Sequence, residues 1–299
     1  MDKEKLVSVI IPTYKRADML CRAIDSVLNQ TYKEVQIVVV DDNNPDTEFR
    51  YLTQKLMERY SENSKVKYIC HESNKNGAVA RNTGIENSDG EMLCFLDDDD
   101  YFMPSKIEEQ VRYLERHPQY HAVYCGFTRD GKTELPKLEG NLCYEYLSGD
   151  VSLWTDTIMI RKEDAIACGG WDTSLKRHQE AGFLLRYMDC GGKIGVVSKN
   201  LVFLDVSDRS NEPENPQINE KYTLFYLQSY EYIIEKISLE DKKNRKKIYL
   251  HRYRGILLHY LKARDIKGAC SFYVRKCLNY PFSFNISMVG YVFTKLRGR

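Results

Sequence analysis

Four consecutive aspartates, Asp97 to Asp100, are the residues of this sequence best suited to chemistry. They directly follow the apolar run Met92–Leu96, which predicts a buried strand with the carboxylates at its end. Adjacent carboxylates repel, so burying them is costly unless a cation or hydrogen-bond donors neutralise them. Such hard oxygen ligands suit Mg²⁺ or Mn²⁺, with substrate phosphates completing the coordination. The alternative is a solvated acidic turn in which Asp99 or Asp100 caps a helix that begins at Pro104.

Polar side chains also follow three other apolar runs that predict strands. Val7–Ile11 leads into Pro12-Thr13-Tyr14-Lys15-Arg16, Val35–Val40 into Asp41-Asp42-Asn43-Asn44, and Val66–Cys70 into Asn74-Lys75-Asn76-Gly77. In an open parallel sheet, ligands bind beyond the carboxyl ends of the strands. We therefore expect all of these side chains on one rim of one sheet.

Two further segments could contact a phosphate or move a proton. Residues 76–84, Asn-Gly-Ala-Val-Ala-Arg-Asn-Thr-Gly, enter a predicted helix whose free N–H groups, together with Arg81, would attract phosphate. An ordinary turn with Arg81 on a wet face is the alternative. In residues 176–180, Lys-Arg-His-Gln-Glu, Glu180 could be a general base that His178 orients. The residues alone favour a structural role for Glu180, as a carboxylate at the N-terminus of a helix.

The elements that must position these residues alternate between two periods. Apolar residues recur at helical spacing between Ala17 and Gln30, around Leu52 and Leu56, and from Ala78 to Glu86, between the predicted strands. Strands that alternate with helices imply βαβ units and a mainly parallel sheet. Shorter strands at 122–124, 157–160 and 194–197 and a helix at 182–189 continue the α/β pattern, and from residue 216 the chain is predicted to be helical.

Composition is that of a globular protein, and its charge is unevenly distributed. Of 299 residues, 42% are hydrophobic and 29% charged. Residues 241–299 contain 15 Lys or Arg and 2 Asp, a local charge of +13 within a total of +1, so the remainder carries −12. Nine cysteines without a CxxC pair indicate reduced thiols. The N-terminal residues lack a signal-peptide pattern and no apolar stretch is long enough to span a bilayer, so we expect a cytoplasmic enzyme.

Five successive motifs resemble the signatures of family 2 glycosyltransferases. They are VSVIIPTYKR (7–16), VVVDD (38–42), GAVARNTG (77–84), CFLDDDDYFMP (94–104) and GGWDTSLKRHQEAGFLLR (169–186). Their order and spacing cover roughly residues 6–206. The resemblance implies a GT-A fold, a nucleotide-diphosphate sugar donor, most often a UDP-sugar, and inversion of configuration at the sugar. It also implies a divalent metal, Mg²⁺ or Mn²⁺.

The resemblance assigns a role to each matching residue. Those predicted to contact substrate are Pro12, Thr13, Tyr14, Asp41, Asp42, Asn76, Arg81, Asp97, Asp98 and His178. Among them, Thr13 and Tyr14 would hold and stack the nucleobase. Asp42, with Asp41 as a second candidate, would hydrogen-bond that base.

The remaining roles concern the diphosphate, the sugar and the acceptor. Arg81 would lie near the diphosphate, and Asp98 or Asp97 would contact ribose or donor sugar. Asp99 would bind the metal, and Glu180 stands where the family places its catalytic carboxylate. Two departures are that this position is usually Asp, and that residues 41–46 read DDNNPD instead of the commoner DDGS form.

The sequence thus predicts a GT-A catalytic domain at residues 1–215 and a basic, helical C-terminal region at 216–299. Residues 242–247, KKNRKK, are followed by aromatic and aliphatic residues. Further on come the aromatic segment 280–286, YPFSFNI, and the basic residues 295–299, KLRGR. This mixture suits either an interfacial contact with an anionic membrane or a helical cap on the catalytic domain. No nucleic-acid recognition module accompanies it.

The expected acceptor is a glycan or lipid-linked saccharide in surface-polysaccharide assembly, at the inner face of the membrane. Rival functions are a nucleotidyltransferase, which would need a glycine-rich loop after the first strand, and a non-catalytic nucleotide-sugar binding protein.

Overall fold

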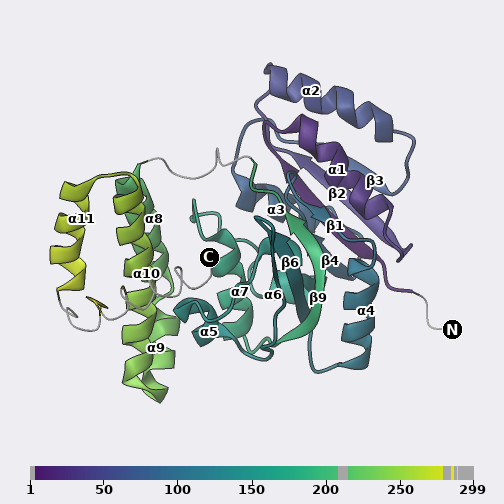
Figure 1. Cartoon of the computed structure of the whole chain (residues 1–299). Coiled ribbons are helices and arrows are strands. Elements are labelled where there is room, and N and C mark those ends of the chain that lie inside the picture. Colours follow the sequence, from purple (N-terminus) through teal and green to yellow (C-terminus); the bar gives the residue numbers. More distant parts are fainter. Residues whose placement is uncertain (1–3, 208–214, 279–283, 286–287, 289–299) are drawn as a thin grey trace. The chain divides into compact units, whose positions relative to one another are not determined.

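The computed structural model describes residues 4–207, 215–278, 284, 285 and 288. Contacts divide the chain into two compact units (Figure 1). The first comprises Met1–Leu142 and Leu153–Asp208, and the second Cys143–Ser152 and Arg209–Arg299. A short segment from the middle of the sequence therefore joins the C-terminal helices, a connection that the sequence analysis did not anticipate.

The first unit is built on one mixed sheet. Among the described residues it has nine strands, in the order β3-β2-β1-β4-β8-β6-β9-β5, with β7 beside β6. The strands are β1 (Val7–Thr13), β2 (Val35–Asp41), β3 (Val66–Cys70), β4 (Met92–Phe95), β5 (Tyr101–Phe102), β6 (Ala122–Arg129), β7 (Lys132–Glu134), β8 (Met159–Arg161) and β9 (Ile194–Leu204). β1 runs parallel to both β2 and β4, and β2 is parallel to β3. The carboxyl ends of these four strands consequently meet at one rim.

Helices cover both faces of this sheet. They are α1 (Ala17–Leu28), α2 (Glu48–Met57), α3 (Gly77–Glu86), α4 (Lys106–Arg116), α6 (Lys162–Ala167) and α7 (Gln179–Asp189). α1 and α4 bury their apolar stripes in one core cluster together with Val7, Val9 and Ile11 of β1. α3 packs on the opposite face, and a Cβ at its Gly84 would lie 2.2 Å from Cγ2 of Ile10. Glycine is thus required where α3 crosses β1.

The α/β class with a largely parallel sheet flanked by helices is confirmed. The predicted strands are present, although those expected at 122–124 and 194–197 extend to Arg129 (β6) and Leu204 (β9), and the one expected at 157–160 is β8, Met159–Arg161. The antiparallel members β5, β7 and β8 make the far half of the sheet mixed. Their shortness explains why periodicity found them poorly.

The second unit is helical, as predicted. Its helices are α5 (Cys143–Ser148), α8 (Pro216–Ser229), α9 (Glu231–Glu240), α10 (Lys242–Lys262) and α11 (Ile266–Phe272), followed by a short π-helix, η3 (Tyr273–Cys277). Tyr260 and Phe272 stack in its core with ring centroids 6.2 Å apart. The buried Tyr260 hydroxyl donates to Glu220 (2.7 Å), which also pairs with Arg275. Among the described helices, none is both long and apolar enough to cross a membrane.

Candidate active site

The four-aspartate run forms a compact acidic cluster just beyond β4. Carboxylate oxygens of Asp97, Asp99 and Asp100 all lie within 4.8 Å of one another. Asp100 is buried and accepts the backbone N–H of Asp205 at 2.6 Å. α4 begins at Lys106 with Ser105 as its N-cap residue, and no side chain caps it. The run is therefore neither a solvated turn nor a helix cap.

A fifth carboxylate, Asp156, joins the cluster from a distant part of the chain. It lies in the 3-10 helix η2 (Thr155–Thr157), is only 3% exposed, and accepts the backbone N–H of Asp97 at 2.6 Å. Burial, followed by repulsion from neighbouring aspartates, raises the pKa values of both Asp100 and Asp156. Closely spaced hard oxygen donors that repel one another suit a divalent cation such as Mg²⁺ or Mn²⁺. The residues present therefore fit the metal that the resemblance implies.

Asp98 points the other way, into the protein. Its carboxylate accepts hydrogen bonds from the Thr13 hydroxyl (2.8 Å), the Tyr14 N–H (3.3 Å) and the Arg16 guanidinium (3.1 Å). Burial raises its pKa to about 7, although Arg16 opposes this rise, and Asp99 adds to it. Arg16 also pairs with Asp99 at 3.0 Å. Asp98 thus holds the ends of β1 and β4 together.

Arg81 connects the acidic cluster to the start of α7. One terminal nitrogen pairs with Asp97 at 2.5 Å, and the other donates to the Gln179 side chain at 3.3 Å. The guanidinium carbon lies 4.7 Å from the ring centroid of Trp171, which is itself stacked on Phe183. This cation–π contact and the ion pair fix the orientation of the guanidinium.

Glu180 stands in the first turn of α7 and is partly exposed. Burial raises the pKa of its carboxyl, Arg81 and Arg177 lower it, and Asp97 raises it further. His178, two residues before Glu180, adopts a left-handed conformation (φ 61°) at the start of α7. A carboxylate with a raised pKa at the edge of an acidic cluster is suited to accept a proton.

Comparison with known proteins identifies the family. The sequence profile described as "Glycosyl transferase family 2" matches residues 8–166, more than half of the chain. The chain belongs to glycosyltransferase family 2. A relative from Erwinia amylovora, named amylovoran biosynthesis glycosyltransferase AmsB, is 25% identical over 283 residues, covering 90% of each chain. An uncharacterized glycosyltransferase of Haemophilus influenzae is 28% identical over 195 residues, covering 61% of this chain and 62% of the relative.

Solved glycosyltransferases share the fold. The structure of S. aureus TarS 1–349 in complex with UDP-GlcNAc superposes with a TM-score of 0.60 at 17% identity, covering 90% of this chain and 91% of TarS. A mannosyltransferase from Pyrobaculum calidifontis in complex with GDP-Man and Mn²⁺ gives a TM-score of 0.59 at 16% identity, covering 98% and 86%. The GT-A fold implied by the resemblance is confirmed.

In this glycosyltransferase, two acids expected at the nucleobase are engaged inside the protein. Asp41 is fully buried and accepts hydrogen bonds from Tyr68 (2.5 Å) and Asn43 (2.8 Å), beside the Arg50 guanidinium. Asp42, 3% exposed, accepts from the N–H groups of residues 75 and 76 and the side chain of Asn74, and its Oδ1 lies 2.7 Å from Nδ1 of His71. Through these hydrogen bonds, both carboxylates hold the loops of the rim in place.

The loop before α3 also differs from the phosphate cradle expected for it. The Asn76 side chain accepts the N–H groups of Ala78 (2.9 Å) and Val79 (3.3 Å), so two first-turn amides are already bonded within the helix cap. Asn76 itself adopts φ 90°. Of the phosphate-binding groups predicted here, Arg81 is the one that faces the acidic cluster.

Three asparagines that sequence reasoning missed hold this rim in place. Asn43 accepts the Lys15 N–H (2.9 Å), and Asn44 accepts the Asn74 N–H (2.8 Å), so both departures from the commoner family loop link neighbouring strand ends. Asn82 bonds both the N–H (2.8 Å) and the carbonyl (2.9 Å) of Trp171. An Asn before a helix is a readable capping signal, but these long-range bonds leave no mark in the local sequence.

Exposed rings lie near the end of β1. Tyr14 and Phe49 are 39% and 41% exposed, and the Lys15 ammonium lies 4.9 Å and 5.4 Å from their ring centroids. Pro12 is partly buried, whereas Thr13 is buried and its hydroxyl donates a hydrogen bond to Asp98. Of the predicted nucleobase contacts, Tyr14 is thus the side chain open to solvent.

Proposed function

We propose that this protein transfers a sugar from a nucleotide-diphosphate donor, a UDP-sugar, to a hydroxyl of a glycan or lipid-linked saccharide. The observation that carries the proposal is the cluster of Asp97, Asp99 and Asp100 beside Arg81 and Glu180 at one rim of the sheet. A donor diphosphate needs cations that neutralise its charge, and the acceptor needs a base. We assign the first need to Arg81 and to a metal ion held by the aspartates, and the second to Glu180.

Donor binding is assigned to residues on the rim. Tyr14 would stack the nucleobase, a role suited to its exposed ring. Asp99, with Asp97 and Asp100, would hold Mg²⁺ or Mn²⁺. When bound, the ion would neutralise charge on the departing diphosphate. Arg81 would add a fixed cation on the same side, while Asp156 orients the backbone of Asp97.

The reaction is proposed to be a single displacement with inversion. The acceptor oxygen forms a bond to the anomeric carbon as the bond from that carbon to the diphosphate oxygen breaks, and the electron pair leaves with the diphosphate. Glu180 takes the acceptor's proton. His178 is proposed to contact the acceptor or orient Glu180, from its position just before α7. The pKa of the Glu180 carboxyl is raised, so this carboxylate is a stronger base than an ordinary surface glutamate.

Replacing Glu180 by Gln tests this assignment. The substitution keeps the size of the side chain and removes its basicity, so we expect transfer to fall by about 10²–10⁴-fold. Donor binding, measured by thermal shift with Mn²⁺ and UDP- or GDP-sugars, should be unchanged. Glu163→Gln, at an exposed carboxylate of α6, is the matched control. Undiminished transfer by the Glu180 variant would contradict the base assignment.

Product assays on the wild type separate the rival functions. A nucleotidyltransferase would release pyrophosphate from a nucleoside triphosphate and a sugar phosphate. A binding protein would retain the donor without turnover in the wild type. Residues 12–16, at the end of β1 and directly after it, contain no glycine for a triphosphate loop.

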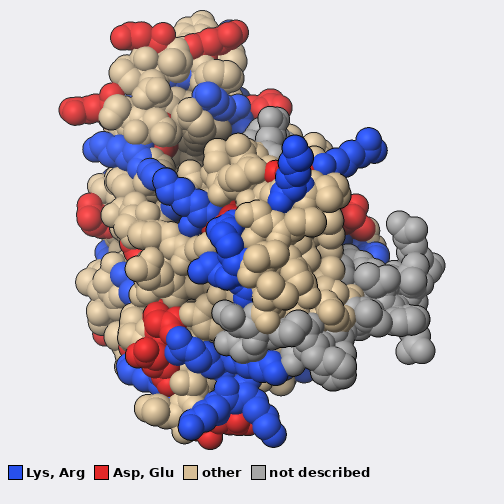
Figure 2. Space-filling model, turned by 90° about the vertical axis from the view of Figure 1, so that its left-hand side faces the viewer, with Lys and Arg blue, Asp and Glu red and all other residues tan. Residues whose placement is uncertain are grey.

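We also propose that the enzyme works at the cytoplasmic face of an anionic membrane, through its basic second unit, in surface-polysaccharide assembly. Lys and Arg side chains gather in several groups on the face shown in Figure 2. Exposed apolar residues of the second unit include Val274 and Leu239, at 60% and 87% exposure. Cations mixed with exposed apolar groups favour an interfacial contact. The segments 280–286 and 295–299, expected to contribute, lie largely outside the described residues.

Flotation with liposomes tests the membrane contact. We expect the full chain to float with vesicles containing phosphatidylglycerol and to do so less after Val274→Glu. Ile166→Glu, at a residue of the first unit with 56% exposure, serves as the matched control. Equal flotation of both variants, or none of the wild type, would contradict the proposal.

A further inference from the structure

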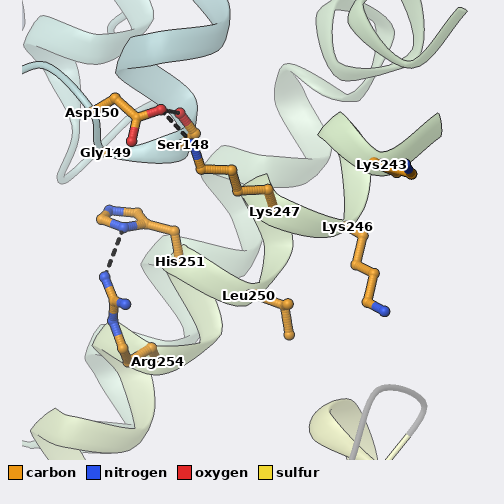
Figure 3. A pocket seen from close by; sticks show the side chains of 9 residues that line it. All are labelled: Ser148, Gly149, Asp150, Lys243, Lys246, Lys247, Leu250, His251 and Arg254. Atoms are coloured by element: carbon orange, nitrogen blue, oxygen red, sulfur yellow. Dashed lines mark hydrogen bonds and ion pairs between the residues drawn. The ribbon is translucent and has the colours of Figure 1, made fainter. Parts of the chain in front are cut away.

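The second unit contains a pocket that the sugar-transfer proposal does not use. It lies between α10 and the loop that follows α5, and its volume is about 350 Å³ (Figure 3). Four cations and one carboxylate line it: Lys243, Lys246, Lys247 and Arg254, with Asp150. With its histidine neutral, the lining therefore carries a net charge of +3. All of these residues belong to the same unit of the chain.

The cations stand at an unfavourable place on their helix. α10 begins Lys-Lys-Asn-Arg-Lys-Lys, and its first turn has no acidic residue. The N-terminus of a helix carries partial positive charge, so cations there are destabilising, and like charges four residues apart repel. Asp241 caps the helix by accepting the Lys243 N–H at 2.8 Å. Of the five cations in these six residues, Arg245 pairs with Glu231 and Lys247 with Asp150. The like charges still lie close together at the start of α10, and a bound anion would relieve their repulsion.

The wall opposite these lysines is built for close approach. Gly149 has φ +79°, and a Cβ there would lie 2.0 Å from Cε1 of His251. The imidazole therefore packs directly on the glycine. Lys247 pairs with Asp150 at 2.6 Å, and the Ser148 hydroxyl donates to the same carboxylate at 2.8 Å (Figure 3). Asp150 is thus committed to Lys247 and Ser148, and Lys243 and Lys246 extend from α10 without contributing to that ion pair.

His251 reports on the charge inside the pocket. An Arg254 nitrogen lies 3.1 Å from Nδ1 of its ring, which therefore accepts a hydrogen bond and is not protonated. The groups that face it are Asp150 from the loop and Lys247, Arg252 and Arg254 from α10. Burial, followed by the neighbouring arginines, lowers its pKa to about 4. Burial first, and the positive charge of the neighbouring arginines second, thus keep the ring neutral near neutral pH.

We propose that this pocket binds a phosphate ester, with Lys243, Lys246 and Arg254 as its ligands. Lysine and arginine donate charge-assisted hydrogen bonds to phosphate oxygens. A volume of about 350 Å³ accommodates a group larger than one orthophosphate. The ester is either the headgroup of an anionic phospholipid or the phosphate of a soluble metabolite. Binding there requires neither the acidic cluster nor the sugar donor, so this proposal can be tested independently of the proposed transfer.

Titration with inorganic phosphate and pyrophosphate, in the full chain, tests the site. We expect both anions to shift the His251 imidazole signals in ¹H–¹⁵N NMR and to raise the pKa of that residue, since an anion favours the protonated ring. Lys243→Gln combined with Lys246→Gln should weaken pyrophosphate binding about tenfold or more, as measured by calorimetry. Lys262→Gln with Lys267→Gln removes the same charge from exposed positions of the same unit and is the control. It should change affinity less than twofold.

A second variant perturbs the pocket without changing its charge. Gly149→Ala would force His251 from its place, and pyrophosphate affinity should fall while the Tm of the first unit stays the same. Vesicles with and without phosphatidylglycerol identify the source of the phosphate. Flotation that the Lys243/Lys246 variant loses and the control keeps assigns a lipid headgroup, and pyrophosphate binding without flotation assigns a soluble ester. Absence of both, or equal losses in the variant and its control, overturns the proposal.

Discussion

The buried carboxyl of Asp98 should make the metal-free protein less stable as pH rises. Its pKa is about 7 in the folded chain, against an ordinary value of 3.8 for an aspartate carboxyl. Below the lower value the carboxyl is protonated in both states. Between the two values the unfolded chain loses the proton and the folded chain keeps it. The stability that this group contributes is therefore present at low pH and is lost as pH rises through about 7.

The size of the effect follows from these two pKa values. Each pH unit in this interval changes the unfolding free energy by about 1.4 kcal/mol per proton. Between about pH 5 and 8, the contribution of Asp98 should fall by roughly 2.5 kcal/mol. Asp100 and Asp156 act with the same sign, since their pKa values are also raised. The wild type alone would therefore not isolate Asp98.

The variant Asp98→Asn isolates the contribution of Asp98 to the pH dependence of stability. The asparagine amide can still accept hydrogen bonds from the Thr13 hydroxyl and the Tyr14 N–H, but it does not titrate. Both tryptophans, Trp154 and Trp171, belong to the first unit, so urea unfolding followed by tryptophan fluorescence in EDTA reports on that unit. We expect the variant to gain about 2.5 kcal/mol relative to wild type between about pH 5 and 8. A difference that stayed constant, or changed with the opposite sign, would refute the reasoning.

Three further outcomes are expected. Mn²⁺ should raise the Tm more at about pH 8 than at about pH 5.5, because carboxylates must lose their protons before they bind the ion. An equal rise in Tm at both pH values would argue against a carboxylate site. Asn82→Ala removes both bonds to the Trp171 backbone, so the unfolding free energy should fall by about 1–3 kcal/mol and transfer should slow, whereas unchanged values would show the bonds to be dispensable. Gly84→Ala should lower the unfolding free energy by about 1–3 kcal/mol, because the added Cβ would clash with Ile10. At Gly255 an added Cβ meets no atom within 4 Å, so Gly255→Ala should leave the unfolding free energy unchanged or raise it. Similar losses of unfolding free energy for both variants in a urea titration would contradict the packing argument.

Much of the fold could be predicted because its signal is local. The strands β1 to β4 are continuous apolar runs, and α1 has a clear apolar stripe, so period and length sufficed. The rim location of the polar residues followed from the parallel order of these strands. Periodicity was weak for β5, β7 and β8, which have two or three residues each and are held by their neighbours.

The site was harder to predict because its geometry depends on contacts between distant residues. The run of aspartates does not reveal that Asp98 points inward while Asp97 and Asp99 stay partly exposed. Nothing around Asp156 suggests that it belongs with residues some sixty positions earlier. The residues themselves suggested that Arg81 contacts phosphate, whereas the role of Glu180 as a base came from the resemblance. The structure adds a physical link between the two through Gln179, and the electrostatic effect of Arg81 on Glu180.

The membership of Cys143–Ser152 in the second unit has a consequence for how the chain is made. α5 contacts α9 and α10, and α10 is synthesised about 95 residues after it. At roughly 5–20 residues per second, α5 waits on the order of 5–20 s for that partner. During this interval its buried residues Tyr146 and Leu147 remain uncovered on a nascent chain whose strands β8 and β9 are still emerging. Translation speed between α5 and α10 should therefore influence the yield of folded protein more than translation speed within β1 to β4.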